Sequence, residues 1–196
     1  MDMEIKSSEH SAGLGQNLSM NPKKFLLWLA IVSIIMMFAA FTSAYLVRRA
    51  EGNWLEFSIP KIFTYSTIVL LISSISMHIA YIAAKKDNVM LLRLSISFTF
   101  VLGIVFLIMQ FLGWGELTNN NVFFVGNPSG SFFYVLSGLH GLHIVSALIV
   151  LIFALVAAFK LKVHAKKLSQ IEMCVTYWHF LDILWLYLFV FLLYNI

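Results

Sequence analysis

The sequence predicts an all-α integral membrane protein, a bundle of five transmembrane helices. Of its 196 residues, 61% are hydrophobic and 11% are charged, whereas soluble domains are about 45–50% apolar and about 25% charged. Five apolar stretches each exceed the roughly 18 residues that a helix needs to cross the hydrocarbon core of a bilayer. They cover residues 25–47, 62–84, 92–114, 132–159 and 174–195. None alternates apolar and polar residues as the strands of a membrane β-barrel do.

The distribution of basic residues predicts the orientation of the helices. Residues 1–24 lack the apolar core of a signal peptide, and we interpret them as a cytoplasmic tail before a transmembrane domain over residues 25–196. Because cytoplasmic loops are rich in Lys and Arg, we expect a cytoplasmic N-terminus and an external C-terminus. The basic residues on the expected cytoplasmic side are Lys6, Lys23, Lys24, Lys85, Lys86, Arg93, Lys160, Lys162, Lys166 and Lys167. Those on the opposite side are Arg48, Arg49 and Lys61.

The residues between the apolar stretches agree with uninterrupted helices. Pro22, Pro60 and Pro128 each come shortly before an apolar stretch, where a helix tolerates proline. The long loop before the fourth helix is uncharged except for Glu116 and ends in residues 127–131, Asn-Pro-Ser-Gly-Ser. For this segment we predict a turn and a serine cap on the fourth helix.

Polar side chains inside the predicted spans are the candidate functional residues, because they are costly in a membrane. His140 and His143 are three residues apart, hence on one side of the fourth helix. They are either ligands or proton carriers, or two neutral imidazoles hydrogen-bonded to adjacent helices, which we favour. His179 and Asp182 in the fifth helix are also three apart and can pair. The remaining candidates are His78, Gln110, Glu116, Glu172 and Trp185, and we interpret Thr42, Ser43, Ser73, Ser74 and Ser76 as packing residues.

The depths of the histidines argue against a haem site. His140 lies in the outer third of its helix and His179 near the inner face, which is a separation of roughly 15 Å at 1.5 Å per residue. His78 shares a level with His179, so a stand-alone membrane cytochrome remains one alternative. A small transporter or proton channel lined by the last two helices is another. The single cysteine, Cys174, excludes an internal disulfide, and the sequence has no basic stripe interleaved with aromatic residues that would indicate nucleic-acid binding.

Two dense motifs resemble those of one membrane-protein family. Residues 138–143, Gly-Leu-His-Gly-Leu-His, resemble the GxHGxH motif of haem-copper oxidase subunit III, the cytochrome c oxidase subunit 3 family. Residues 177–185, Tyr-Trp-His-Phe-Leu-Asp-Ile-Leu-Trp, look like the YWHFxDxxW signature of its last helix, with Glu172 before it. The segment from Gln110 to Trp114 and Glu116 is similar to the outer end of the family's third-from-last helix. The resemblance covers about residues 25–196.

The resemblance implies an accessory subunit with no catalytic residue, haem, copper or other metal of its own. Such a subunit packs against subunit I, which holds the haem and copper sites that reduce oxygen to water while protons are pumped. Subunit II, other oxidase subunits and phospholipid are further expected partners, and a larger respiratory supercomplex stays open. The subunit supports assembly, proton uptake and durability of subunit I. The candidate residues would then be buried polar ties that fix the helix packing.

The sequence departs from the family in three places. It resembles the short five-helix bacterial form, which lacks the first two helices of longer members, and this resemblance implies a location in the inner membrane of a bacterium. Residues 25–47 contain no counterpart of a glutamate that many relatives carry, and Gly113 replaces an acidic residue of some relatives. The family includes cytochrome c and quinol oxidases. Tyr177 before the Trp-His pair favours the cytochrome c branch, whereas Leu181-Asp182 is common in the quinol branch, which stays the alternative.

Overall fold

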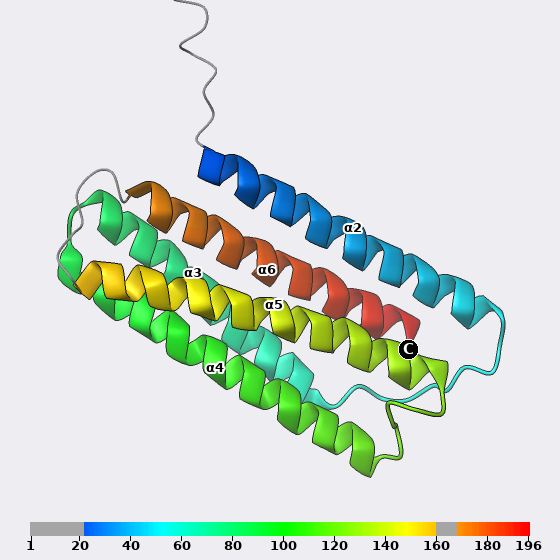
Figure 1. Ribbon diagram of the computed structural model, residues 1–196. Coiled ribbons are helices and arrows are strands. Elements are labelled where there is room, and N and C mark those ends of the chain that lie inside the picture. Colours follow the sequence, from blue (N-terminus) through cyan, green and yellow to red (C-terminus); the bar gives the residue numbers. More distant parts are fainter. Residues whose placement is uncertain (1–21, 160–167) are drawn as a thin grey trace, which may run out of the picture.

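The computed structural model describes residues 22–159 and 168–196, which form five long α-helices (Figure 1). They are α2 (Pro22–Ala50), α3 (Lys61–Lys85), α4 (Val89–Asn119), α5 (Pro128–Phe159) and α6 (Leu168–Asn195). All five are long and apolar enough to cross a membrane, which confirms the predicted all-helical fold. The tail up to residue 21 and the lysines at 160, 162, 166 and 167 lie outside the described residues, so the orientation of the helices stays a prediction.

Each helix begins before its predicted apolar stretch, and α6 begins at Leu168 rather than at residue 174. The first turn of a helix accepts polar residues, so apolar character marks the hydrocarbon layer rather than the hydrogen-bonded helix. The predicted serine cap on α5 is wrong. Asn127 caps this helix, because its Oδ1 accepts hydrogen bonds from the backbone N–H groups of Ser129 at 2.9 Å and Leu55 at 3.3 Å. Asn127 thereby also fixes the loop that follows α2.

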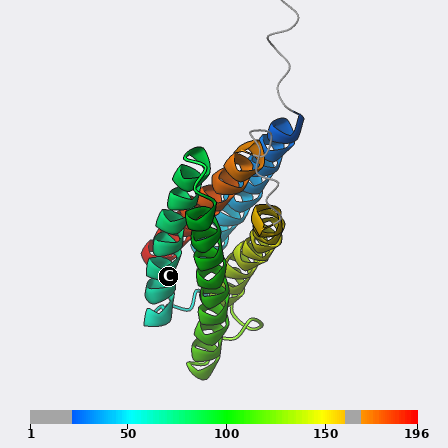
Figure 2. The same ribbon diagram turned by 90° about the vertical axis from the view of Figure 1, so that its left-hand side faces the viewer.

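Four helices form the centre of the bundle, and the remaining helix, α2, lies against its side. Helices α3, α4, α5 and α6 contact one another in a closed ring, in the order α3–α4–α5–α6–α3, while α2 packs on α5 and α6 (Figures 1 and 2). Helices α2 and α6 run in the same direction, because Lys24 contacts Glu172 near their starts and Arg49 contacts Asn195 near their ends. The motif-bearing helices α5 and α6 are therefore covered on two sides.

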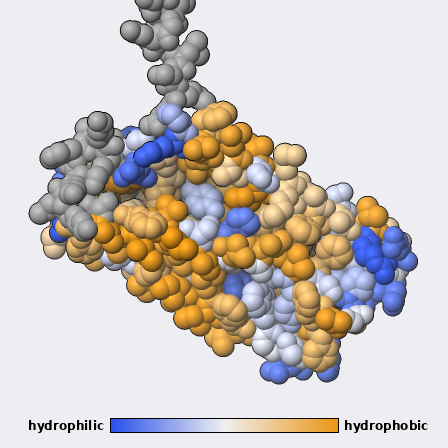
Figure 3. Space-filling model, viewed as in Figure 1, coloured by the Kyte–Doolittle hydropathy of each residue, from blue (hydrophilic) through white to orange (hydrophobic). Residues whose placement is uncertain are grey.

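Large aromatic side chains fill the centre of the bundle. Phe63, Phe106, Phe133, Trp178 and Trp185 are each about 1% exposed or less. The outside of the bundle is apolar too, and in Figure 3 hydrophobic residues cover most of the visible face while hydrophilic residues gather towards its ends. Exposed apolar surface of this extent is stable only against lipid or against other membrane subunits.

Candidate functional site

Two tryptophans of α6 form buried hydrogen bonds to hydroxyl groups of α3. The indole Nε1–H of Trp178 donates to Ser73 Oγ, and that of Trp185 donates to Thr67 Oγ1, both at 2.9 Å. The tryptophans are seven residues apart, which is two helical turns, so they point to the same side of α6. An indole N–H buried in hydrocarbon needs an acceptor. These two contacts therefore fix how α6 sits on α3.

His179 and Asp182 lie between the two tryptophans, on the same side of α6. His179 Nδ1 and Ser74 Oγ share a hydrogen bond of 2.7 Å, and Asp182 Oδ2 is 3.8 Å from the same nitrogen. The predicted pair is therefore present at ion-pair distance, with Ser74 as the closer partner of the imidazole. Asp182 is 2% exposed, and its carboxylate makes no hydrogen bond to any residue that the structure describes. A buried carboxylate of this kind depends on its histidine neighbour, because an isolated buried charge is costly.

His140 is enclosed by aromatic rings. It is fully buried, its ring centroid is 4.9 Å from that of Trp185 with 31° between the planes, and Phe106 meets it edge-on at 5.9 Å. Neither ring nitrogen has a hydrogen-bond partner among residues 22–159 and 168–196. The predicted hydrogen bond from His140 to an adjacent helix is wrong, because rings fill the space where a polar partner would lie.

His143 points to a different part of the bundle. Its Nδ1 donates to the carbonyl oxygen of Leu139 in the same helix at 2.7 Å, since a carbonyl only accepts, and its ring is 5.8 Å from that of Phe38 in α2. Here too the expected bond to an adjacent helix is replaced, by a bond within α5. Positions three apart on a helix differ by about 60° around its axis. That angle is enough to place His140 in the four-helix centre and His143 towards α2.

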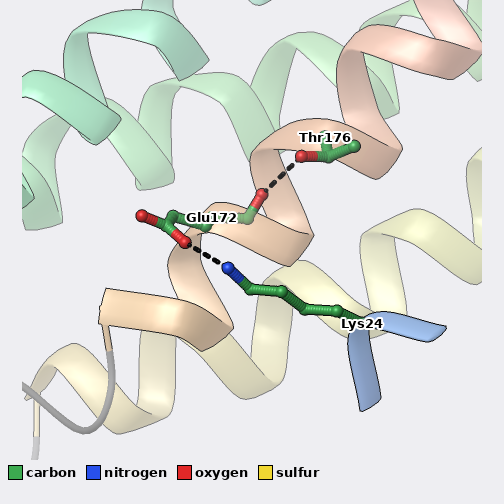
Figure 4. A network of polar contacts seen from close by, with 3 residues as sticks. All are labelled: Lys24, Glu172 and Thr176. Carbon is green, nitrogen blue, oxygen red and sulfur yellow. Dashed lines mark hydrogen bonds and ion pairs between the residues drawn. The ribbon is translucent and has the colours of Figure 1, made fainter. Parts of the chain in front are cut away.

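Glu172 joins α6 to α2 at the end of the bundle where both helices begin. Its Oε2 is 3.0 Å from Lys24 Nζ, and its backbone carbonyl accepts a hydrogen bond from Thr176 Oγ1 at 2.9 Å (Figure 4). The side chain of Lys24 remains 47% exposed and that of Glu172 30% exposed. Such a pair contributes about 0–1 kcal/mol, so it orients α2 more than it stabilises the bundle.

Gln110 and Trp114 link α4 to its neighbours near the opposite end. Gln110 Nε2 donates to Ser66 Oγ of α3 at 3.2 Å, and Trp114 Nε1 donates to Ser137 Oγ of α5 at 3.1 Å. Gln110 is 2% exposed, as expected for a polar tie inside a span. Across the described ranges, no three His, Cys, Asp or Glu side chains come together in a way that could hold a metal ion.

Comparison with known proteins identifies the family. The sequence matches the family described as cytochrome c oxidase subunit III over residues 6–195. The chain belongs to the cytochrome c oxidase subunit III family. "Probable cytochrome c oxidase subunit 3" of Nocardia farcinica is 31% identical over 174 residues, which is 84% of this chain and 82% of the relative. "Cytochrome c oxidase subunit 3" of Thermostichus vulcanus is 33% identical over 171 residues, 81% and 80% of the two chains. "Cytochrome bo(3) ubiquinol oxidase subunit 3" of Buchnera aphidicola from Acyrthosiphon pisum is 30% identical over 183 residues, 91% and 89%.

The candidate residues of this subunit III differ in burial more than the sequence predicts. His140, Asp182, Gln110 and Trp185 are buried. His143, His179 and Glu172 are half-buried, while His78 and Glu116 are exposed on this chain. The expectation of buried ties is therefore wrong for His78 and Glu116 within this chain, because both face outward from their helices; Glu116 is exposed although the next residue, Leu117, is fully buried. The rings of His78 and His179 are 6.0 Å apart, which agrees with their predicted common level.

Several polar ties of this subunit III come from residues interpreted as packing. Ser73 and Ser74 accept or share hydrogen bonds from the last-helix motif, and Ser76 Oγ donates to the Ser95 carbonyl oxygen at 3.1 Å. Thr67, the acceptor for Trp185, was not a candidate at all. The signal that points to them is the motif itself, because two indole donors inside a membrane require hydroxyl acceptors at matching depth on a neighbouring helix.

Proposed function

We propose that the chain is an accessory subunit of a bacterial aerobic oxidase that takes electrons from cytochrome c. One observation carries the proposal: the polar side chains of the last-helix motif point into the chain's own bundle, where Trp178 and Trp185 meet Ser73 and Thr67. A motif used in this way holds the helices rigidly together, so that the outside of the bundle offers a fixed surface to a partner, and it does not form a reaction site. Subunit I is the proposed direct partner for that surface, alongside subunit II, and haem and copper belong to those partners.

The arrangement of the histidines supports this role over a proton channel through α5 and α6. His140 is closed off by Trp185 and Phe106, and His143 lies on the side facing α2. His179 lies on the side facing α3. Side chains that point in three directions do not line one path, whereas each suits the fixing of one helix contact. Proton pumping therefore belongs to the complex, and this chain supports its durability.

We also propose a phospholipid in the hollow between α2 and α5. The hollow has a volume of about 910 Å³, and its walls carry small residues of α2, Ala40 and Ala44, next to Arg48 and the first turn of α5 at Pro128. Small residues on a helix let a neighbouring chain approach its backbone closely, and we propose that an acyl chain does so here. A phosphate group would lie near the Arg48 guanidinium, which also contacts Glu51 at 2.8 Å, and near the positive end of the α5 helix dipole.

The first test of the structural role replaces the buried polar pair. We expect Asp182→Ala and His179→Ala to loosen the purified complex, seen as loss of this chain during chromatography, more than they slow the first turnovers of oxygen reduction. Asp182→Asn keeps the volume of the side chain and removes its charge, so we expect it to retain more of the chain than Asp182→Ala. A variant that stayed fully assembled yet lost oxygen reduction at once would contradict the structural role.

The electron donor requires its own test, because relatives of both branches are similar to the chain to the same degree. Tyr177 supports the cytochrome c branch at the level of the motif, and its hydroxyl pairs with Ser146 Oγ at 2.8 Å. We expect the purified complex to consume oxygen with reduced cytochrome c and not with quinol alone. Oxygen consumption with quinol alone would assign the chain to the quinol branch, and the structural role would be unaffected.

A further inference from the structure

The loop between α4 and α5 exposes three consecutive apolar side chains. Phe123 is 51% exposed, Phe124 56% and Val125 80%. No charged residue occurs between Glu116 and the start of α5, and residues 119–121, which precede the buried Val122, are asparagines. A connecting loop in water is usually polar. Three neighbouring apolar residues at its tip therefore need an environment other than water.

Hydrogen bonds hold this loop in one conformation, so the exposure of its apolar side chains is a fixed property of the fold. The hydroxyl of Tyr134 donates to the Val122 carbonyl oxygen at 2.9 Å, and Ser131 Oγ donates to the Phe124 carbonyl oxygen at 2.6 Å. The backbone turns at Asn121 and Gly126, whose φ angles are +60° and +129°. The loop is fixed to the first turns of α5 on one side and presents its apolar side chains on the other.

A continuous series of aromatic rings connects the loop to the apolar surface of α4. Phe111 is 65% exposed on α4, and its ring centroid is 5.0 Å from that of Trp114. The series continues from Trp114 to Tyr134 and from Tyr134 to Phe124, each at 6.2 Å. Trp and Tyr gather where membrane spans meet the headgroups. The Trp114 carbonyl oxygen also lies 3.3 Å from the Tyr134 hydroxyl that binds Val122, so the loop is level with this aromatic belt.

We propose that residues 122–126 form an interfacial anchor that inserts Phe123, Phe124 and Val125 into the boundary between lipid headgroups and acyl chains. Lipid is the occupant that fits, because the apolar loop is continuous with the membrane-facing side of α4 and carries no charge for pairing with a protein. The anchor fixes the height of this end of the bundle in the bilayer. It depends only on the chain crossing the membrane, not on the electron donor of the complex.

The test measures the depth of the loop in the oxidase complex reconstituted into phosphatidylcholine vesicles. An environment-sensitive fluorescent amino acid replaces Val125, and in a matched control it replaces Asn120, an exposed residue of the same loop. We expect the label at position 125 to lose most of its emission to a nitroxide lipid labelled near the headgroup, and little to aqueous iodide. The label at position 120 should respond in the opposite way.

Two results would overturn the anchor. Quenching of position 125 by iodide, to the same extent as position 120, would place the loop in water. Emission quenched by neither iodide nor lipid would show that a partner subunit covers it. As a second measurement, Phe124→Asp should shift the emission at position 125 to the red, while Phe124→Leu should not, and equal emission from both variants would also contradict the anchor.

Discussion

Replacing Gly113 by alanine tests the packing between α3 and α4 directly. A Cβ atom at this position would lie 2.6 Å from Phe63 Cζ and 2.7 Å from Phe63 Cε2, well inside van der Waals contact. The ring cannot easily move away, because Phe63 is 1% exposed and meets Phe133 edge-on at 5.1 Å. Overpacking of this kind costs about 1–3 kcal/mol. The same clash makes an acidic side chain at this position incompatible with Phe63.

Gly115→Ala is the matched control in the same helix. A Cβ atom there would meet nothing within 4 Å, so the variant should gain up to about 1 kcal/mol from helix propensity. The two variants share that gain, and they should differ by the overpacking cost alone. At roughly 2–4 °C per kcal/mol for a chain of this size, Gly113→Ala should melt about 2–12 °C below Gly115→Ala.

The assay is the melting temperature of the purified complex, followed as loss of monodisperse protein after heating. Phe63→Leu removes the ring atoms that clash, so it should recover much of the loss when combined with Gly113→Ala. Alone it should destabilise the protein, because it leaves a cavity. Coupling of this size is typical of residues in direct contact. Equal melting temperatures for Gly113→Ala and Gly115→Ala would refute the close approach of α3 and α4.

Two further variants test contacts of α6. Trp185→Phe removes the donor to Thr67 and leaves a cavity beside His140, so it should cost more than Thr67→Val, which removes the hydroxyl acceptor at a cost of about 1 kcal/mol. The double variant should cost less than the sum of the two single variants, because both remove the same hydrogen bond. A fully additive double variant, measured by the same melting assay, would show that the hydrogen bond is not the cause. Lys24→Ala breaks the exposed contact with Glu172 and should change stability by less than about 1 kcal/mol at any salt concentration. A loss above about 2 kcal/mol in low salt, in the same assay, would mean that this pair is more important than its exposure indicates.

The five helices could be predicted from the sequence because each apolar stretch exceeds the thickness of the hydrocarbon layer. The ends of the helices could not be predicted as well. The start of α5 depends on Asn127, whose side chain binds both its own helix and the backbone of Leu55 in the preceding loop. Such a cap depends on a tertiary contact, and a turn motif alone favours the neighbouring serines equally.

The side to which each polar residue points could be predicted only in part. A soluble helix reveals its buried side by the polar residues on the other, but these helices are apolar all round. The different surroundings of His140 and His143 follow from the position of α2 against α5 and α6, which no periodicity in the sequence records. The pairing of His179 with Asp182 was predictable because both lie on one helix, whereas Ser74 belongs to another helix and needed the structure.

The most direct test of the central claim is purification in mild detergent through a tag on this chain. The absorption spectrum of the purified product is then recorded, and its subunits are identified. We predict a coloured complex that contains a large haem-copper subunit, and a colourless chain once it is dissociated from that complex. Haem retained by the isolated chain would contradict the claim by making it an electron carrier. A colourless chain without an oxidase partner would contradict the accessory role itself.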